Sequence, residues 1–466
     1  MALNRDRLLP IEPDARAVAR RLLDAVADLP ILSPHGHTDP LWYADNAPFR
    51  DPAALFVVPD HYIFRMLYSQ GVPLERLGVP RVDGGPVETD GRAIWRLFAD
   101  HYALFRATPS RLWFEHSLET VFGIEERLSP DNADALYDAI SERLRADDMR
   151  PRALYERFGI EAISTTDAAI DDLAAHERTR ASGWAGRVLP CYRPDAVIDA
   201  DRPDFAASLD RFLEMTGQDR TYAGYLEAHR RRRAYFKARG ATATDHGHPT
   251  AATADRPAAE AEALFERLAA GRGDRRDAEA FRAQMLTEMA RMSLEDGLVM
   301  QIHPGSWRNH NAALFQRFGL DKGADIPTRT DYVRALKPLL DAVGNEPSLT
   351  VILFTLDETA YSRELAPLAG HYPALRLGPA WWFFDSPEGM RRFRETTTET
   401  AGFYNTVGFN DDTRAFLSIP ARHDVARRVD CAHLARLVCD GRLDEDEAHE
   451  VALDLTYRLA KAAYRL

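Results

Sequence analysis

Two histidines separated by a single glycine, His35 and His37, are the residues whose types and spacing point most directly to chemistry. An apolar run at residues 29–32 leads into them and predicts a short buried strand that ends near Pro34. Side chains two residues apart on a strand point to the same side, so both imidazoles would face one point beyond the strand end. Two imidazoles make half of a first-row metal site. The other interpretation is a pair of surface histidines in a loop.

A carboxylate near the other end of the chain, Asp412, is the residue that we expect to complete this metal site. Two imidazoles and one carboxylate leave coordination positions open for water or substrate oxygens, as a catalytic site requires. Asp411 competes for the role, but strand alternation lets only one of the two face the site. His303, at the end of another apolar segment, is expected as a further ligand or a substrate donor, and His246 is a similar candidate. Either could instead be a buried structural histidine.

Arg193 and Arg414 each follow a predicted strand and favour an anionic ligand, because a guanidinium grips a carboxylate or phosphate with two parallel hydrogen bonds. The alternative is a structural pair with a nearby acid, Asp195 or Asp411. Trp381 opens a run of aromatic residues. One Trp face would stack on the C–H side of a sugar, while other members of the run pack in the core.

The segment around His61 offers polar groups at the start of a predicted helix. Asp60 follows a proline and has the residue type and position of an N-cap. His61, Tyr62 and Arg65 then occupy the first turns, with His61 and Arg65 on one face, so that both can contact a substrate. Donors at a helix N-terminus can bind an anion or serve in proton transfer. The alternative is an ordinary amphipathic helix whose apolar residues pack.

Eight short apolar segments, each ending in polar residue types, must position these side chains. Helical patterns separate the segments, and strands that alternate with helices predict a parallel sheet. Eight such strands fit a closed (β/α)8 barrel of the TIM type, in which the active site lies at the carboxyl ends of the strands. The segments are residues 31–37, 160–167, 187–195, 240–248, 297–303, 349–357, 374–385 and 405–414.

The chain is expected to add large helical insertions to this α/β barrel. Residues 1–39 would carry an N-terminal helix and the first strand, and residues 40–155 a mostly helical insertion that covers the barrel mouth. Residues 156–414 would hold the rest of the barrel, with a second helical insertion at about 196–290. Residues 415–466 would form C-terminal helices.

The composition describes an acidic chain of 466 residues with a net charge of -13 and 45% hydrophobic residues, enough for a large core. Because an acidic chain has no general attraction for nucleic acids or anionic membranes, we expect neither as a partner. A basic run at residues 229–233 is expected on a solvated helix face. Three cysteines indicate reduced thiols, and the N-terminus lacks an apolar signal core, so we expect a cytoplasmic location. A homo-oligomer is compatible with the sequence.

Taken together, the motifs resemble those of the uronate (glucuronate) isomerase family, an outlying branch of the amidohydrolase superfamily. They occur in the family's order across nearly the whole chain, and the set is specific although each motif alone is weak. The matching motifs are HGH (35–37), DHYIFRM (60–66), TTD (165–167), RPD (193–195), DHG (245–247), MQIHPGSWRN (300–309), GPAWWFFD (378–385) and VGFNDDTRAFLS with RHDVARR (407–428).

The resemblance implies a distorted (β/α)8 barrel and reversible aldose–ketose isomerisation of hexuronates. The implied reactions convert D-glucuronate to D-fructuronate and D-galacturonate to D-tagaturonate. The resemblance also implies a divalent metal, usually zinc, on His35, His37 and Asp412. The positions that match the family's substrate and catalytic residues are His61, Tyr62, Arg193, His303, Trp381 and Arg414.

The expected chemistry moves a proton from C2 to C1 of the open-chain sugar through an enediol. We expect Asp412 or a hydroxide on the metal as the base, Tyr62 as a proton shuttle to oxygen, and Arg414 with the metal as the stabilising charge. Arg193, helped by His61, would hold the C6 carboxylate. The first alternative function is a metal-dependent hydrolase of a lactone, amide or ester on the same barrel. The second is a sugar-acid binding protein without chemistry.

Overall fold

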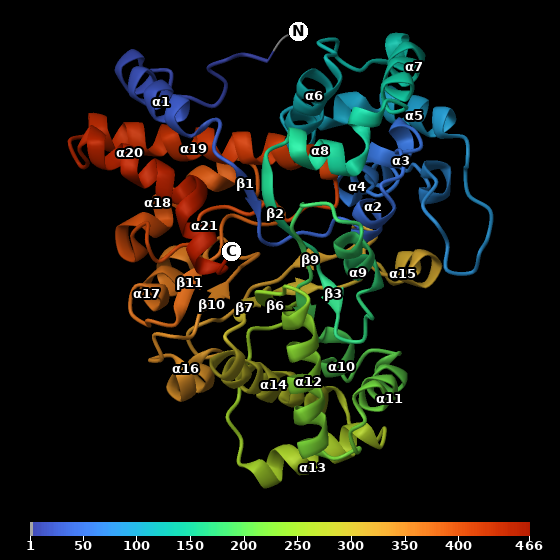
Figure 1. The fold of residues 1–466 in the computed structure, drawn as a ribbon, viewed down its shortest axis with the longest axis vertical. Coiled ribbons are helices and arrows are strands. Elements are labelled where there is room, and N and C mark those ends of the chain that lie inside the picture. Colours follow the sequence, from blue (N-terminus) through green and yellow to red (C-terminus); the bar gives the residue numbers. More distant parts are fainter. Residues whose placement is uncertain (1–2) are drawn as a thin grey trace.

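A ring of short parallel strands lies at the centre of the computed structural model, which describes residues 3–466 (Figure 1). The strands of the ring are β1 (Ile31–Ser33), β2 (Ile160–Ser164), β3 (Asp167–Ala168), β4 (Val188–Leu189), β5 (Tyr192–Arg193), β6 (Ala243–His246), β7 (Val299–Ile302), β10 (Val351–Leu353) and β11 (Leu375–Leu377). They form two parallel ladders, in the orders β1-β2-β4 and β11-β10-β7-β6-β5-β3. All eight predicted segments contribute in chain order, which confirms the prediction of a parallel barrel.

The ring is distorted where its first and eighth segments meet. In the eighth segment, Thr406 pairs with Leu377 of β11 through an isolated parallel bridge. Further along, the backbone N–H of His37 donates to the carbonyl of Thr413 at 3.1 Å. No ladder joins these two segments within residues 3–466, and this hydrogen bond marks the point where the early histidines lie next to the late acidic segment.

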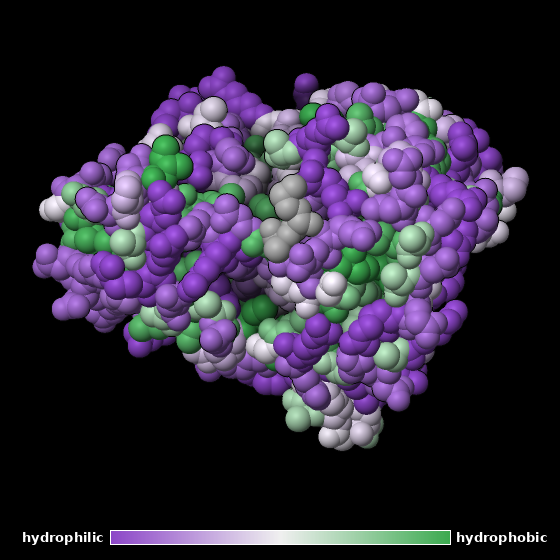
Figure 2. Space-filling view, turned by 90° about the horizontal axis from the view of Figure 1, so that it is seen from above, coloured by the Kyte–Doolittle hydropathy of each residue, from purple (hydrophilic) through white to green (hydrophobic). Residues whose placement is uncertain are grey.

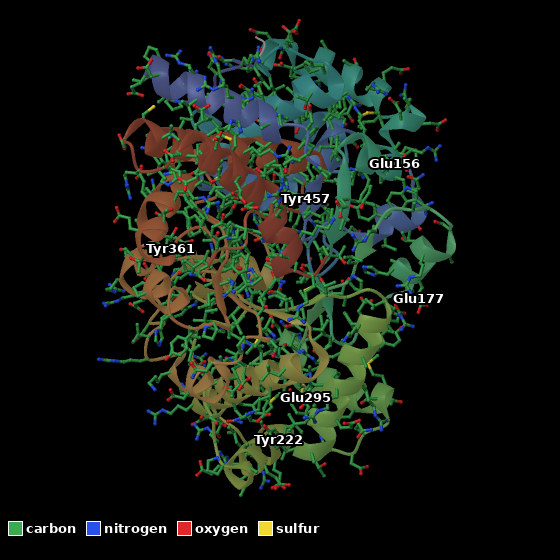
Figure 3. All side chains as sticks on the ribbon, turned by 60° about the vertical axis from the view of Figure 1, so that its left-hand side comes forward. Glu156, Glu177, Tyr222, Glu295, Tyr361 and Tyr457 are labelled. Carbon is green, nitrogen blue, oxygen red and sulfur yellow. The ribbon has the colours of Figure 1, made fainter. Side chains whose placement is uncertain are left out.

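The C-terminal helices close the barrel at the end opposite the predicted site. The wholly buried Tyr464 packs among side chains of the barrel interior, and its hydroxyl donates to Oε1 of Gln301 on β7 at 3.1 Å. Tyr457, labelled at the middle of the molecule in Figure 3, donates to Glu161 on β2 at 2.6 Å. The interior is therefore a packed core and not a pore, as is usual for this architecture.

The first insertion, residues 40–155, is mostly helical and occupies the upper right of Figure 1. It builds an apolar core of its own, in which Trp95 is wholly buried and donates its indole N–H to the carbonyl of Ala133 at 2.9 Å. An aspartate side chain caps the N-terminus of each of its first four α-helices. The α-helices are α2 (Pro40–Asp45), α3 (Pro52–Phe56), α4 (His61–Ser69), α5 (Gly91–Asp100), α6 (Pro109–Phe122), α7 (Ala133–Arg143) and α8 (Pro151–Arg157).

A second helical layer lies at the bottom of Figure 1 and corrects one expectation in part. Its helices are α10 (Asp195–Ile198), α11 (Phe205–Thr216), α12 (Tyr222–Ala238), α13 (Ala258–Ala269) and α14 (Arg275–Asp296), whereas α9 (Ala174–Ala181) lies above this layer, against α2. The basic run at 229–233 lies within α12, but Arg232 and Arg233 are buried. Arg233 donates to Asp296 of α14 at 2.6 Å, and the neighbouring Arg230 pairs with Glu295, labelled in Figure 3. Arg230 and Arg231 are exposed, so the run is partly solvated as expected, while its buried side joins two helices.

The remaining elements surround the barrel. The N-terminal helix α1 (Pro13–Val26) packs against α19 (Ile419–Cys439) and α20 (Glu445–Leu453), as Figure 1 shows. The others are β8 (Ser306–Trp307), β9 (Ile326–Pro327), α15 (Ala312–Phe318), α16 (Lys337–Val343), α17 (Ala366–Ala369), α18 (Pro387–Ala401) and α21 (Leu459–Ala463). Polar residues cover most of the face in Figure 2. Among the described residues, no helix is long and apolar enough to cross a membrane.

Candidate active site

A cavity of about 1410 Å³ lies at the carboxyl ends of the barrel strands, against the first helical insertion. Residues from distant parts of the chain converge on it, as the barrel prediction requires. The predicted site residues that line it are His35, His37, His61, Tyr62, Arg193, His303, Trp381, Asp412 and Arg414.

Arg65 is the predicted site residue that the structure does not bring to this cavity. Its guanidinium lies over the ring of Phe383, with 5.1 Å between the central carbon and the ring centroid. The helix meets the cavity at its N-terminus, and a residue four positions after His61 lies about 6 Å further along the axis. A shared helix face therefore did not place Arg65 beside His61 in the site, and the substrate role expected for it is not supported.

His35 and His37 both face Asp412. The distances from their Nε2 atoms to Oδ1 of Asp412 are 3.3 and 3.0 Å. The indole N–H of Trp381 donates to the other oxygen of the same carboxylate, Oδ2. Asp412 has a φ of 41°, a left-handed conformation that is uncommon for a residue with a side chain and concentrates at functional sites. One ligand atom from each of His35, His37 and Asp412 lies within 4.8 Å of the others.

These three residues fit a divalent metal ion. Oδ1 of Asp412 is buried and accepts no hydrogen bond from the part of the chain that the structure describes, although two imidazole nitrogens face it. Buried carboxylate oxygens nearly always have a partner, and an ion held by all three residues would supply one. Burial opposes a charge on both imidazoles and lowers the pKa of His37. Burial is also the largest influence on His35, but the charge of Asp412, its hydrogen bond and the charge of Asp245 together outweigh burial and raise the pKa of His35.

Asp411 points away from the candidate metal group, which consists of His35, His37 and Asp412, as strand alternation predicts. Its Oδ2 lies 3.1 Å from Nε2 of His423 on α19. The competition between the two neighbouring aspartates is therefore resolved in favour of Asp412 by the direction of their side chains.

His303 lies next to the metal group and is held by Asp245. Its Nδ1 is 2.6 Å from Oδ1 of Asp245, and its ring stacks on that of His35 with 4.5 Å between centroids. Burial, the largest influence on this imidazole, lowers the pKa of His303 to about 4, so that the ring is neutral at pH 7. One ligand atom from each of His35, Asp245 and His303 also lies within 4.8 Å of the others.

On β6 it is Asp245, and not the expected His246, that faces the cavity. Neighbouring side chains on a strand point to opposite sides, so the two residues cannot both face the site. His246 is wholly buried behind the strand, with its Nε2 3.1 Å from Oγ1 of Thr244. The similarity that we expected between His246 and His303 is therefore wrong.

Arg193 stands between two carboxylates and remains open to the cavity. Its Nε donates to Asp195 at 2.8 Å, and its Nη1 lies 3.4 Å from Oδ2 of Asp245. The pairing with Asp195 that the sequence offered as an alternative is thus present, yet 25% of the side chain stays exposed. Gly247 lies against the guanidinium, and a Cβ there would meet Nη2 at 2.2 Å. The group is held in place but can still contact an anion.

Arg414 lines the cavity and pairs with an acid that the sequence did not indicate. Its Nη2 donates to Oδ2 of Asp321 at 2.9 Å, whereas Asp411 is turned away. Burial opposes ionisation of Asp321, but the charges of Arg414 and Arg308 outweigh it and lower the pKa of that carboxyl. About two fifths of the Arg414 side chain is exposed, so its guanidinium is available to a ligand.

Tyr62 enters the site from the first turn of α4. The Asp60 side chain caps this helix, as predicted, by accepting from the backbone N–H of Tyr62 at 2.8 Å. The Tyr62 hydroxyl lies 3.0 Å from each oxygen of Asp385, to which it donates. Arg422 donates to the same carboxylate at 2.8 Å. Burial and the charge of Asp385 raise the pKa of Tyr62 well above its ordinary value, so the phenol stays protonated.

His61 and the two tryptophans form an aromatic wall of the cavity. The ring of His61 lies 5.7 Å from that of Trp382, and Trp381 meets the ring of His303 at 4.7 Å. Burial lowers the pKa of His61 to about 3, so it offers a neutral imidazole. The following Phe384 packs in the main core, so the aromatic run divides between the site and the core as expected.

Four cavity residues or direct partners of site residues were not singled out from the sequence. Asp245 could have been found from strand alternation, because it directly precedes His246, which was considered as a site residue. Asp385 and Arg422 lie in the GPAWWFFD and RHDVARR motifs but were given no role. Asp321 belongs to a connecting segment without a pattern of its own, and no signal pointed to it.

Comparison with known proteins covers the whole chain. The family model described as glucuronate isomerase matches residues 13–464. A uronate isomerase from Brucella suis biovar 1 is 69% identical over 466 residues, which cover 100% of both chains.

Two solved structures share the fold. The crystal structure of glucuronate isomerase from Caulobacter crescentus matches with a TM-score of 0.98 at 61% identity, covering 100% of this chain and 97% of that one. The crystal structure of a uronate isomerase from Thermotoga maritima matches with a TM-score of 0.92 at 26% identity, covering 100% of both chains. This chain belongs to the glucuronate isomerase family, as the family match along nearly the whole chain and the shared distorted TIM-type barrel show.

Proposed function

We propose that the cavity binds an open-chain hexuronate and moves a proton between C2 and C1, interconverting D-glucuronate with D-fructuronate and D-galacturonate with D-tagaturonate. The enzyme is an aldose–ketose isomerase of the uronate isomerase type. One observation carries the assignment to this cavity. Arg193 contacts Asp245, Asp245 contacts His303, and His303 stacks on His35, so a group suited to a carboxylate is joined to the candidate metal group by direct contacts.

Arg193 is assigned to the C6 carboxylate of the substrate. It is the cavity guanidinium that is fixed by two carboxylates while keeping an exposed edge. Binding a remote charged group holds C1 and C2 in one place and lowers the entropic part of the barrier. The neutral imidazole of His61 and the aromatic faces of Trp381 and Trp382 would contact the sugar between the two ends.

His35, His37 and Asp412 would hold a divalent cation, for which the ligand set favours Zn²⁺. When bound, such an ion supplies positive charge near the C1 and C2 oxygens, where negative charge develops. Arg414 faces the same space and adds to that stabilisation through its exposed guanidinium.

Asp412 is assigned the removal of the C2 proton and its return at C1. It is the carboxylate that faces the cavity from the eighth segment, and Trp381 fixes it there by donating to its Oδ2. The C2–H is a weak acid, so this transfer depends on the charges that stabilise the enediolate. Tyr62 stays protonated, so it can give its proton to the C1 oxygen and take one back from the C2 hydroxyl, while Asp385 fixes the phenol in position.

The test compares wild type and Arg193→Ala on a hexuronate and on a neutral hexose, with ketose formation as the readout. Because the lost contact is made only to a carboxylate, kcat/KM for the hexuronate should fall about a hundredfold while any turnover of the neutral sugar stays unchanged. An equal loss on both sugars would remove the carboxylate role. A substrate deuterated at C2 should lose part of its label to water if a proton is transferred.

A further inference from the structure

A second His-Gly-His segment lies behind the wall of the active site. Strand β6 ends in His246, and Gly247 and His248 follow it. Gly247 and Asp195 line the cavity, whereas His246 and His248 do not. Both histidines are buried, with exposed fractions of 0% and 2%. One ligand atom from each of Asp195, His246 and His248 lies within 4.8 Å of the others.

Each of these two imidazoles has one ring nitrogen occupied and the other bare. Nε2 of His246 lies 3.1 Å from Oγ1 of Thr244, and Nδ1 of His248 lies 3.2 Å from Oδ1 of Asp199. Nδ1 of His246 and Nε2 of His248 are buried and have no hydrogen-bond partner among residues 3–466. A metal-bound histidine usually has this arrangement, in which the nitrogen that does not bind the metal is bonded to a carboxylate or another oxygen.

We propose that Asp195, His246 and His248 form a second divalent metal site, distinct from the group around Asp412. Two imidazole nitrogens and one carboxylate oxygen suit a borderline first-row ion such as Zn²⁺. The ion completes the coordination of two buried nitrogens that otherwise have no partner, a state that native structures rarely keep. The proposal does not depend on the reaction assigned to the cavity.

The charges around the site accept a cation. The guanidinium groups that contact the acids of this site are already neutralised: Arg193 contacts Asp195 and Asp245, and Arg282 contacts Asp199 and a further pair of acids. Carboxylates therefore outnumber cationic side chains here.

Asp195 links the proposed site to the cavity. Its Oδ2 accepts from Nε of Arg193 at 2.8 Å, and both of its oxygens lie 3.2 to 3.3 Å from the backbone N–H of Gly247. An ion on Asp195 therefore fixes the carboxylate that in turn holds Arg193. The site is structural in character and supports the anion-binding side of the cavity.

The first test uses the wild-type enzyme, so it needs no substitution. Crystals grown with excess Zn²⁺ are measured at the zinc absorption edge. The proposal predicts an anomalous peak bounded by Asp195, His246 and His248, separate from any peak at Asp412. If saturating zinc gives no peak there, or only the density of a water molecule bridging the bare nitrogens, the proposal is wrong.

The second test isolates the site in solution. In the Asp412→Asn background, which removes a ligand of the other group, Co²⁺ is added and its visible absorption is recorded. Adding His246→Gln or His248→Gln should abolish the band of a low-coordinate Co²⁺ ion, with the fold checked by circular dichroism.

His229→Gln is the matched control for this experiment. His229 is also wholly buried, has an unpartnered Nε2 and contacts the hydroxyl of Tyr192 at 2.7 Å, but belongs to none of the potential ligand groups. It should leave the band intact. Loss of the band in the control alone, or its persistence in folded His246→Gln and His248→Gln, would overturn the assignment. If the substituted proteins do not fold, the anomalous map of the wild type decides.

Discussion

The two His-Gly-His segments of this chain have the same residues and opposite placements. At 35–37 both imidazoles face the cavity and meet Asp412. At 246–248 the imidazoles are buried behind the strand, and Gly247 with the preceding Asp245 faces the cavity instead. Because side chains alternate along a strand, the position of the motif relative to the strand end decides which residues become active-site groups.

The two glycines differ in the same way. A Cβ on Gly36 would find its nearest atoms at 3.5 Å or more, which is ordinary contact. A Cβ on Gly247 would lie 2.2 Å from Nη2 of Arg193 and 3.0 Å from Oδ2 of Asp195. The first glycine is a spacer between ligands, whereas the second makes room for the guanidinium that we assign to the substrate carboxylate.

The largest difference is expected between His35→Asn and His246→Asn. His35→Asn removes a group from the charge-stabilising centre, so kcat should fall about a thousandfold. His246→Asn acts on the cavity only through Asp195 and should lower kcat by less than about tenfold, with its effect mainly on KM. Steady-state kinetics on D-glucuronate, with melting curves for both proteins, measures this. Similar losses of kcat would show that the two segments do not differ in function.

A smaller effect is expected at Asp385, which positions the Tyr62 hydroxyl at the edge of the cavity. Asp385→Asn should lower kcat about thirtyfold with little change in KM, because the phenol loses the carboxylate that orients it. In the Tyr62→Phe background the same substitution should have no further effect on kcat, since there is no hydroxyl left to position. Additive losses in the double variant would contradict the positioning role.

Gly247→Ala tests the contrast between the two glycines directly. The added methyl group must displace the flexible end of Arg193, so KM for a hexuronate should rise about tenfold while the melting temperature changes little. Gly36→Ala, the matched substitution in the other segment, meets only ordinary contacts and should leave this KM within about twofold. Equal effects on KM would mean that Gly247 does not serve Arg193.

The smallest effect on activity is expected at Asp167, which is buried next to the barrel wall. Burial raises the pKa of this carboxyl to about 7, although the hydroxyl of Thr165 donates to it at 2.7 Å. A raised pKa in the folded state means that stability is present at low pH and is lost as pH rises toward and through 7. Asp167→Asn should therefore raise the free energy of unfolding at pH 8 by up to about 4 kcal/mol.

The pH comparison supplies the control for Asp167. Near pH 4, where the carboxyl is protonated in the folded protein, Asp167→Asn should change stability little, and kcat should be unaffected at either pH. Denaturant titrations at the two pH values measure the difference. A destabilised variant at pH 8 would show that Asp167 is stabilised as an anion.

The parts of this site that could be predicted from the sequence are those fixed by strand geometry. The spacing of His35 and His37 gave their common direction, and counting eight strands placed the late Asp412 beside them. The residues that were missed or misplaced depend on packing between elements. Arg65 lies one turn too far along its helix, and Asp321 comes from a connecting segment whose path no local pattern specifies.

The prediction that the basic run on α12 lies on a solvated face was incomplete for the same reason. Its charge pattern alone suggested solvent exposure, but Arg233 is buried because Asp296 on another helix neutralises it. A charged residue can be buried when it is paired, and the partner here lies 63 positions away. The local sequence therefore predicted the strands of the barrel better than it predicted the contacts between the surrounding helices.

The most direct test of the central claim is a crystal structure of the slow variant Tyr62→Phe with D-glucuronate bound. We expect the C6 carboxylate to contact Arg193, and C1 and C2 to lie next to Asp412 with their oxygens facing His35 and His37. A sugar bound in the reverse direction, with its carboxylate at the His35–His37–Asp412 group, or bound outside this cavity, would contradict this expectation.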